Sequence, residues 1–222
     1  VAQRRSYERF LVVEPIGFSF DEISAAEHDR LRDLYTPLTD SLRRLIQAGI
    51  QSGADEATIR EAQALIDSAA EKLGGVGAPS QVRLAVGNRP VVWGNPVTGF
   101  RNAIAPPLVM HEDQDGLWWS EFELGQAYQG PPGWVHGGVL ALVLDQLLGE
   151  AASDGLTKPL FTGTITLRYL RGTPLGRLRA EAAVERTDGY KTFVSGHMSD
   201  AEGKTVEAEG IFIKPVWARD AG

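Results

Sequence analysis

A single carboxylate interrupts the most apolar stretch of the chain. Residues 139–148, VLALVLDQLL, are apolar except for Asp145 and the neighbouring Gln146. In apolar surroundings, an unpaired carboxylate either costs folding free energy or has a raised pKa. A carboxyl group whose pKa approaches neutrality can act as a general acid or base. The alternative is structural, with Asp145 at an edge of the core and paired with Arg168 or Arg171. The residues alone leave both interpretations open.

The residues before this stretch offer a second chemical feature. Gly137 and Gly138 directly follow His136. If a helix begins here, its first amides have no partner inside the helix and lie at the positive end of its dipole. With no side chains to shield them, such amides can hold a carbonyl oxygen that develops negative charge. Two successive glycines also form tight turns between a strand and a helix, and this is the commoner case.

The spacing of these two features limits how they can work together. Gly137 and Asp145 are eight residues apart, which is about 12 Å along a straight helix. One small reacting group cannot touch both. Either the two residues serve different purposes, or two copies of the helix lie antiparallel, with Gly137 of one copy facing Asp145 of the other. We therefore expect a homodimer with two identical sites, or a dimer of such dimers.

The element that carries these residues is predicted to be a long helix over residues 137–154. A helix that is apolar on all sides is expected to be buried on all sides. Residues 165–170, 177–185 and 205–213 instead alternate between apolar and polar, which is typical of strands. The order of two strands, one helix and four strands predicts an α+β fold. In it, a curved antiparallel sheet of five or six strands wraps around the central helix.

The first 80 residues are predicted to form a helical N-terminal extension. Ser24 and Glu27 match a capping box at a helix start. Leucines follow at helical spacing, and Pro37 should either kink this helix or begin a second one. Asp55 should cap a further helix. The apolar face of that helix consists of Ile59, Ala62, Ile66, Ala69 and Leu73.

This extension is expected to end in a linker. Gly74 and Gly75 should stop the last helix, and the whole stretch GGVGAPS, residues 74–80, has the composition of a linker. We therefore divide the chain into residues 1–80 and a second domain over residues 81–222.

Composition limits the possible functions. The chain has no cysteine, so a disulfide or a thiol nucleophile is excluded. Its four histidines are scattered, and we expect no metal site and no cofactor. A net charge of −7 argues against a nucleic-acid partner. No apolar run is long enough for a membrane span, and VAQRRSYERFLVVEPIGF lacks the features of a secretory signal. We expect a cytoplasmic protein.

The segment GPPGWVHGGVLALVLDQLLGEAA resembles the active-site segment of hotdog-fold acyl-CoA thioesterases of the phenylacetate-pathway (PaaI) type. The family pattern is His-Gly-Gly, six residues and Asp, which His136, Gly137, Gly138 and Asp145 match. The strand TGTITLRYLRGTPL resembles the family's next strand, with Thr162 at its hydroxyl position. NPVTGFRNAIAPPL, residues 95–108, resembles the entry to the first strand. The resemblance covers residues 95–214.

The resemblance implies a hotdog fold and hydrolysis of an acyl-CoA. The Gly137 amide would polarise the thioester carbonyl, and Asp145 would act as general base or nucleophile. Thr162 would orient Asp145 or the water, while His136 would shape the turn. Gly138 and Gly130 would lie at the substrate. Gly130 stands where some members have an Asn, and this difference puts a second oxyanion donor in doubt.

Two further positions bear on the resemblance. The usual Pro after the strand's Arg is Gly172 here, which should leave the strand end less rigid. CoA phosphates call for basic side chains, and Arg171 and Lys191 lie near strand ends where they could reach them. Trp118, Trp119, Trp134 and Phe161 could line the acyl pocket, although core packing is the commoner use of such residues.

Two other functions are compatible with the same fold. Hotdog dehydratases and hydratases use a His with a carboxylate. Here His136 and Asp145 are nine residues apart on one helix and therefore lie on opposite sides of it. A non-catalytic acyl-CoA-binding module would not need Asp145. Thioester hydrolysis is the function that uses all of the matching residues.

Overall fold

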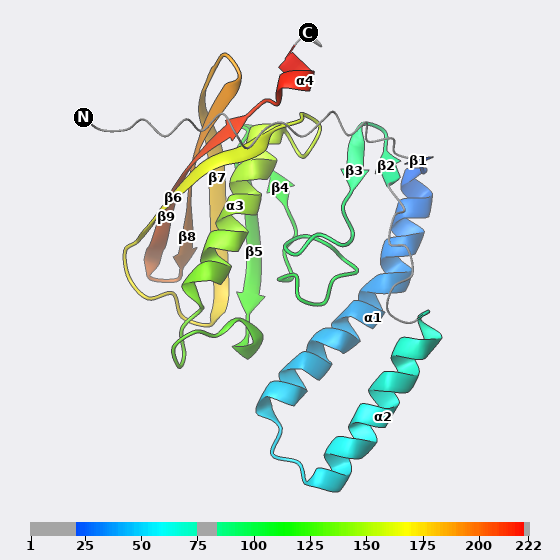
Figure 1. Ribbon diagram of the computed structural model, residues 1–222. Helices are drawn as coiled ribbons and strands as arrows, with labels where there is room; N and C mark the ends of the chain where they lie inside the picture. Colours follow the sequence, from blue (N-terminus) through cyan, green and yellow to red (C-terminus); the bar gives the residue numbers. More distant parts are fainter. Residues whose placement is uncertain (1–20, 75–83, 220–222) are drawn as a thin grey trace, which may run out of the picture.

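The computed structural model describes residues 21–74 and 84–219 (Figure 1). The strands are β1 Asp21–Glu22, β2 Leu84–Val86, β3 Arg89–Val91, β4 His111–Glu112, β5 Trp118–Leu124, β6 Phe161–Tyr169, β7 Gly176–Asp188, β8 Lys191–Asp200 and β9 Gly203–Ile213. The helices are α1 Ala25–Gln51, α2 Glu56–Lys72, the 3-10 turn η2 Gln126–Tyr128, α3 Gly137–Ser153 and α4 Val216–Arg219.

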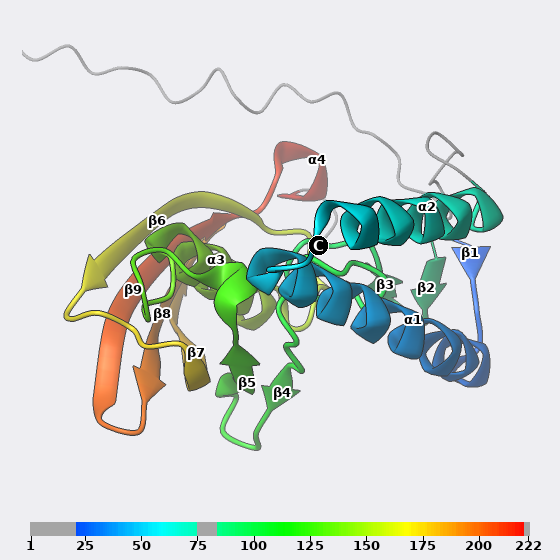
Figure 2. The same ribbon diagram turned by 90° about the horizontal axis from the view of Figure 1, so that it is seen from below.

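The body of the molecule is a six-stranded antiparallel sheet with α3 lying across one face. The strand order is β4-β5-β7-β8-β9-β6, so β4 and β6 form the two edges. In Figures 1 and 2 the strands curve around α3. The chain order of two strands, one helix and four strands is the predicted one, and the α+β prediction is confirmed.

The core lies between α3 and the strands beneath it. Alternate residues of β7, such as Leu178, Ala180 and Ala182, are buried toward the helix. Leu148 of α3 sits directly over Gly196 and Gly210 on the two strands below. A Cβ atom at Gly210 would come within 2.9 Å of a Leu148 methyl group, and one at Gly196 within 3.3 Å of the other. Glycine at these positions lets the helix approach the sheet closely.

One face of α3 is left open, so the prediction that this helix is buried on all sides is wrong. Gly138 and Leu142 are exposed, and Asp145 and Gly149 are partly exposed. These residues recur at helical spacing and form one stripe. The sheet ends at β6, and no further element among the described residues covers the helix beyond that edge. Apolar composition predicted burial of this face, but the chain alone does not bury it.

The N-terminal helices begin where the sequence predicts. The Ser24 hydroxyl accepts a hydrogen bond from the Glu27 amide at 3.1 Å, and the Asp55 carboxylate accepts one from the Thr58 amide at 2.8 Å. The Glu27 carboxylate pairs with Arg30 instead of completing the capping box. α1 continues through Pro37 as a single helix, so a second helix after Thr36 does not form.

α2 ends at Lys72, and Gly74 adopts a positive φ of 100° just beyond it. Gly75 and the rest of the expected linker lie outside the described residues. Among the residues that are described, no helix is both long and apolar enough to cross a lipid bilayer.

α1 is attached to the body at several points. β1 pairs in parallel with β2, which joins the chain before α1 to the chain that follows the expected linker. The buried Thr39 hydroxyl donates to the Phe100 carbonyl at 2.8 Å, and the Arg43 guanidinium donates to the Ala105 carbonyl at 3.1 Å. In Figures 1 and 2 the α1–α2 hairpin extends beyond β4, at the end of the sheet opposite β6. The division at residue 80 remains a prediction.

Candidate active site

Asp145 has a hydroxyl partner on the neighbouring edge strand. The Thr162 hydroxyl donates to Asp145 Oδ1 at 3.0 Å. Thr162 precedes a bulge in β6, where the pairing with β9 skips Gly163. A side chain at Gly163 would collide with Ile213, with its Cβ only 2.6 Å from the Ile213 Cδ1 methyl group. A bulge changes the direction of the adjacent side chain, and this one accompanies the turn of Thr162 toward α3.

The structural alternative for Asp145 is wrong. Arg168 pairs with Glu207 at 3.0 Å on the exposed surface, and Arg171 pairs with Asp200. Asp145 forms no ion pair within residues 21–74 and 84–219. Over the same residues, no group of three His, Asp or Glu side chains comes together as metal ligands would. Asp145 is therefore a carboxylate with a single hydroxyl partner on the open face of α3.

The start of α3 leaves one amide available. His136 is the N-cap, and its Nδ1 accepts the Gly138 amide at 3.0 Å. The His136 ring thus holds the first turn of the helix through this hydrogen bond. The Gly137 carbonyl accepts a hydrogen bond from the Tyr169 hydroxyl at 2.9 Å, but its amide has no acceptor in the described part of the chain. Of the two glycine amides, only that of Gly137 can bind a substrate oxygen.

The amides of Gly138 and Gly130 both have acceptors within the described residues, and a role for these glycines at the substrate stays a prediction. The Gly138 amide is held by His136, and the Gly130 amide donates to the Trp134 carbonyl at 2.9 Å. Gly130 also lies so close to His136 that a Cβ atom would come within 2.9 Å of the His136 Cα. The side-chain oxygen of Gln129, Oε1, accepts the Gly133 amide at 2.9 Å and closes the same loop. This loop therefore supplies no second oxyanion donor from these residues.

Neither predicted phosphate ligand is placed to bind CoA from this chain. Arg171 donates to both oxygens of Asp200 and to the Gly203 carbonyl, and its proximity lowers the pKa of the Asp200 carboxyl. The charge of Arg171 is therefore paired with Asp200 just beyond the end of β6. Thr192 and Val194 are buried toward α3, so alternation along β8 puts Lys191 on the opposite face of the sheet. A role for either residue in binding CoA therefore stays a prediction, and the contact between Arg171 and Asp200 is one that the sequence alone did not reveal.

Gly172 does not leave its strand end loose. The Trp134 ring packs against it so closely that a Cβ atom would come within 2.5 Å of that ring. A proline could not fit beside this tryptophan. Trp118 is buried in the core, Trp119 stacks on His111, and Phe161 is half exposed on the edge strand.

Both halves of the candidate site contact the same strand. Gly137 is bound through its carbonyl to Tyr169 near one end of β6, and Asp145 is bound to Thr162 near the other. The eight-residue separation remains about 12 Å along α3. One chain therefore does not bring the available amide and the carboxylate together.

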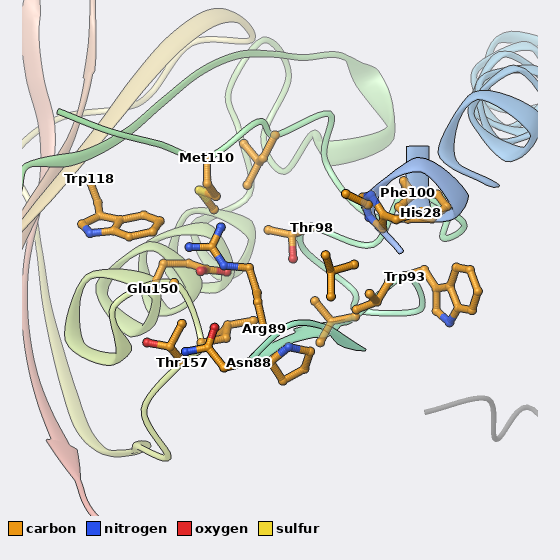
Figure 3. A pocket seen from close by; sticks show the side chains of 18 residues that line it. His28, Asn88, Arg89, Trp93, Thr98, Phe100, Met110, Trp118, Glu150 and Thr157 are labelled. Carbon is orange, nitrogen blue, oxygen red and sulfur yellow. The ribbon is translucent and has the colours of Figure 1, made fainter. Parts of the chain in front are cut away.

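The main pocket lies on a different side of α3 (Figure 3). It has a volume of about 640 Å³ and is lined by residues from α1, β3, β5 and the end of α3, but by neither Gly137 nor Asp145. Arg89 from β3 and Glu150 from α3 point toward one another across it. This pocket is separate from the residues that the sequence singled out.

Glu150 is a buried carboxyl group that sequence reasoning missed. It is only 7% exposed, and its burial raises the pKa of the carboxyl. The Gln146 amide donates to Glu150 at 2.9 Å, and Gln146 in turn accepts from Asn95 at 3.2 Å. The spacing of four residues between Gln146 and Glu150 was the available signal, since it puts both on one face of an apolar helix.

Known proteins resemble this chain in sequence and in fold. A sequence model of the thioesterase superfamily matches residues 132–207. A crystal structure of a thioesterase superfamily protein is 34% identical, with a TM-score of 0.73 over 81% of this chain and 90% of that protein. This chain belongs to the thioesterase superfamily. The structural likeness covers 81% of this chain, whereas the second domain alone is less than two thirds of it. The likeness to this superfamily member therefore extends into the N-terminal region.

Curated members of the superfamily match a shorter stretch. Mouse acyl-coenzyme A thioesterase THEM4 is 33% identical over 99 residues, which are 43% of this chain and 42% of that protein. Human acyl-coenzyme A thioesterase THEM5 is 26% identical over 99 residues, which are 42% and 38% of the two chains. The match therefore spans about two fifths of the length of these relatives. Together with the sheet and its central helix, these similarities confirm the hotdog thioesterase fold.

The raised pKa of Glu150 predicts how stability depends on pH. The folded protein binds this proton more tightly than the unfolded chain does, so folding loses stability as the pH rises and Glu150 ionises. Glu150→Gln keeps an acceptor for Gln146 but cannot ionise. We expect this variant to have a higher Tm than the unmodified protein at neutral and alkaline pH, with the difference shrinking in acid.

Thermal unfolding of both proteins across this pH range measures the effect. Glu123→Gln, on the exposed face of β5, is the matched control and should show no such trend. A Glu150→Gln variant with a lower Tm than the unmodified protein at neutral pH, and a smaller deficit in acid, would show that ionised Glu150 stabilises the fold.

Proposed function

We propose that the protein hydrolyses an acyl-CoA, or a similar acyl thioester, to a free acid and a thiol. The relatives named acyl-coenzyme A thioesterase support the reaction class. The observation that carries the proposal is the hydrogen bond from Thr162 to Asp145 on the open face of α3. A carboxylate that is partly exposed, forms no ion pair with the described residues and is oriented by a hydroxyl is suited to accept a proton from water or to attack a carbonyl carbon.

The chemistry needs a donor for the thioester oxygen. In the base route, Asp145 takes a proton from water as the water oxygen bonds to the carbonyl carbon. In the nucleophile route, Asp145 bonds to that carbon itself, and water later cleaves the resulting anhydride. In both routes the carbonyl oxygen becomes negatively charged, the Gly137 amide stabilises it, and the C–S bond breaks to release the thiolate. The thiolate then takes up a proton.

The two groups come together in an antiparallel pair of chains. Residue 141 is the midpoint between Gly137 and Asp145 along α3, and residues 165–166 are midway between their partners Thr162 and Tyr169 along β6. A single two-fold axis near these midpoints would relate both the helices and the edge strands. It would place Gly137 of one chain opposite Asp145 of the other, and would do so twice.

The surface around this proposed axis is suited to burial. β6 is an edge strand with one row of backbone groups free to pair. Phe161 is 49% exposed, Tyr169 52% and Leu142 38%. An edge strand and an apolar helix face next to each other form a surface that a second copy can cover with the same residues. The pocket of about 640 Å³ between Arg89 and Glu150 is lined by neither Gly137 nor Asp145, which is compatible with an active site that a partner chain completes.

A hotdog dehydratase or hydratase is less compatible with this geometry. Such chemistry needs a histidine that exchanges protons next to the carboxylate. Here His136 Nδ1 already accepts the Gly138 amide. His136 and Asp145 are also nine residues apart, about 900° or two and a half turns of helix, so they lie on opposite sides of α3. A non-catalytic binding module gives no reason for the contact between Thr162 and Asp145.

Replacing Asp145 tests its role in the chemical step. Asp145→Asn keeps an oxygen that accepts the Thr162 hydroxyl but removes the proton acceptor. We expect kcat for hydrolysis of acyl-CoA to fall by about 100-fold or more. KM should change little and the Tm should be retained, because no ion pair is lost. Release of free thiol from a panel of acyl-CoAs measures the rate.

Asp154→Asn is the matched control for this substitution. It makes the same chemical change at the end of the same helix, where Asp154 has a positive φ of 55° that Asn also adopts. It should leave kcat unchanged. If Asp145→Asn turns over as fast as the unmodified protein, Asp145 is not the catalytic group.

Thr162 is expected to position Asp145 and not to transfer the proton itself. Thr162→Ala should therefore lower kcat by less than Asp145→Asn does. Thr162→Ser restores the hydroxyl and should recover most of the rate, whereas Thr162→Val keeps the size of the side chain and should not. Equal rates for the Ser and Val variants would show that the hydroxyl has no role.

A further inference from the structure

Helix α2 is exposed along its entire length. All of its 17 residues are solvent-exposed, and none is buried against another element of the described chain. Large apolar residues are among them. Ile59 is 52% exposed to solvent, Ile66 is 42% exposed, and Leu73, just after the helix, is 62% exposed. An isolated helix of this length is only marginally stable in water, and most helices in proteins depend on packing of an apolar face. α2 therefore needs a partner.

The apolar residues of α2 follow the heptad spacing of helices that pair side by side. Ile59, Ala62, Ile66, Ala69 and Leu73 are separated by three, four, three and four residues. This spacing places them in one continuous seam, which we call the α2 seam. Four of the six charged residues of α2, namely Arg60, Glu61, Asp67 and Glu71, fall outside the seam and the positions that flank it, while Glu56 and Lys72 lie at flanking positions. The helix thus has one apolar face and one charged face.

The alternation of large and small side chains along the α2 seam indicates which kind of helix can pack against it. The first position of each heptad is large, as at Ile59, Ile66 and Leu73, and the fourth is small, as at Ala62 and Ala69. In an antiparallel pair, first positions face fourth positions, so each layer of a self-pair would contain one large and one small side chain. In a parallel pair, large would face large, and alanine would face alanine across a void. The α2 seam is therefore complementary to itself only when the second helix is antiparallel, an arrangement that a two-fold axis perpendicular to the helices produces.

We propose that α2 is a self-association surface that pairs, antiparallel, with α2 of a second copy of the chain. No other chemistry has to be assumed for the partner, because each copy carries the matching seam. The α1–α2 hairpin extends beyond β4, whereas the proposed active-site dimer forms at β6, at the opposite edge of the sheet. The two surfaces can therefore be used together, and such use would give assemblies of four or more copies. The pairing of α2 does not depend on the proposed function.

A charge placed in the seam should separate the copies. In the full chain, Ile66→Glu puts a carboxylate at the middle of the α2 seam, and we expect it to halve the mass measured by light scattering after size exclusion. Ser68→Glu introduces the same residue outside the seam and should leave the mass unchanged. Retained circular dichroism and Tm of the body show that both variants are folded. Equal masses for the unmodified protein and Ile66→Glu would overturn the proposal.

Cross-linking tests the contact directly and does not depend on the total mass. The chain contains no cysteine, so one introduced cysteine is the only thiol. Ile66→Cys, joined by a short bis-maleimide, should yield a covalent pair of chains at low protein concentration, whereas Ser68→Cys should yield little. If the seam is covered by another part of the same chain or by a different protein, the two variants will cross-link equally or not at all, and the proposal fails. Loss of the β6 interface alone would not change this result.

Discussion

A sheet can cover an apolar helix only as far as its strands extend, and here the sheet ends at β6. α3 is apolar nearly all the way round, yet its stripe through Gly138, Leu142 and Asp145 lies beyond that edge. This geometry gives the chain an uncovered helix face and an unpaired strand next to each other. It also leaves Asp145 within reach of solvent while Thr162 holds one of its oxygens. The candidate site lies on this open face, and the same face is where we propose that a second copy binds.

The start of α3 follows from the same need to satisfy backbone groups. Four amides at a helix start lack partners within the helix. His136 provides a partner for the Gly138 amide through its ring, and the Gly130 amide closes the preceding loop. These contacts rigidify the turn and leave the Gly137 amide as the available donor. A stable turn with one unsatisfied amide is preorganised to bind a developing negative charge.

The sequence was most informative where a local pattern determines structure. Alternation placed the strands, Ser24 and Asp55 marked helix starts, and the spacing from His136 to Asp145 identified the family segment. Periodicity shows which face of a helix is apolar, but not whether the chain covers that face, so the openness of α3 and α2 was not predictable. The partner of Arg171 is Asp200, which is 29 residues away and meets it only once the strands have paired. Glu150 was missed for a similar reason, because its burial depends on the N-terminal strands and on the loop that carries Asn95.

The sharing of each site between two chains can be measured by complementation. Gly137→Pro removes the candidate oxyanion donor at the first position of α3. Proline fits this position, and the preceding His136 already has the extended backbone that proline requires. Asp145→Asn removes the carboxylate, and each variant alone should be nearly inactive. When the two are unfolded and refolded together, half of the dimers contain one chain of each kind, with one intact site out of two. About a quarter of the unmodified activity should therefore return. If the mixture is no more active than the separate variants, Gly137 and Asp145 do not meet across a dimer.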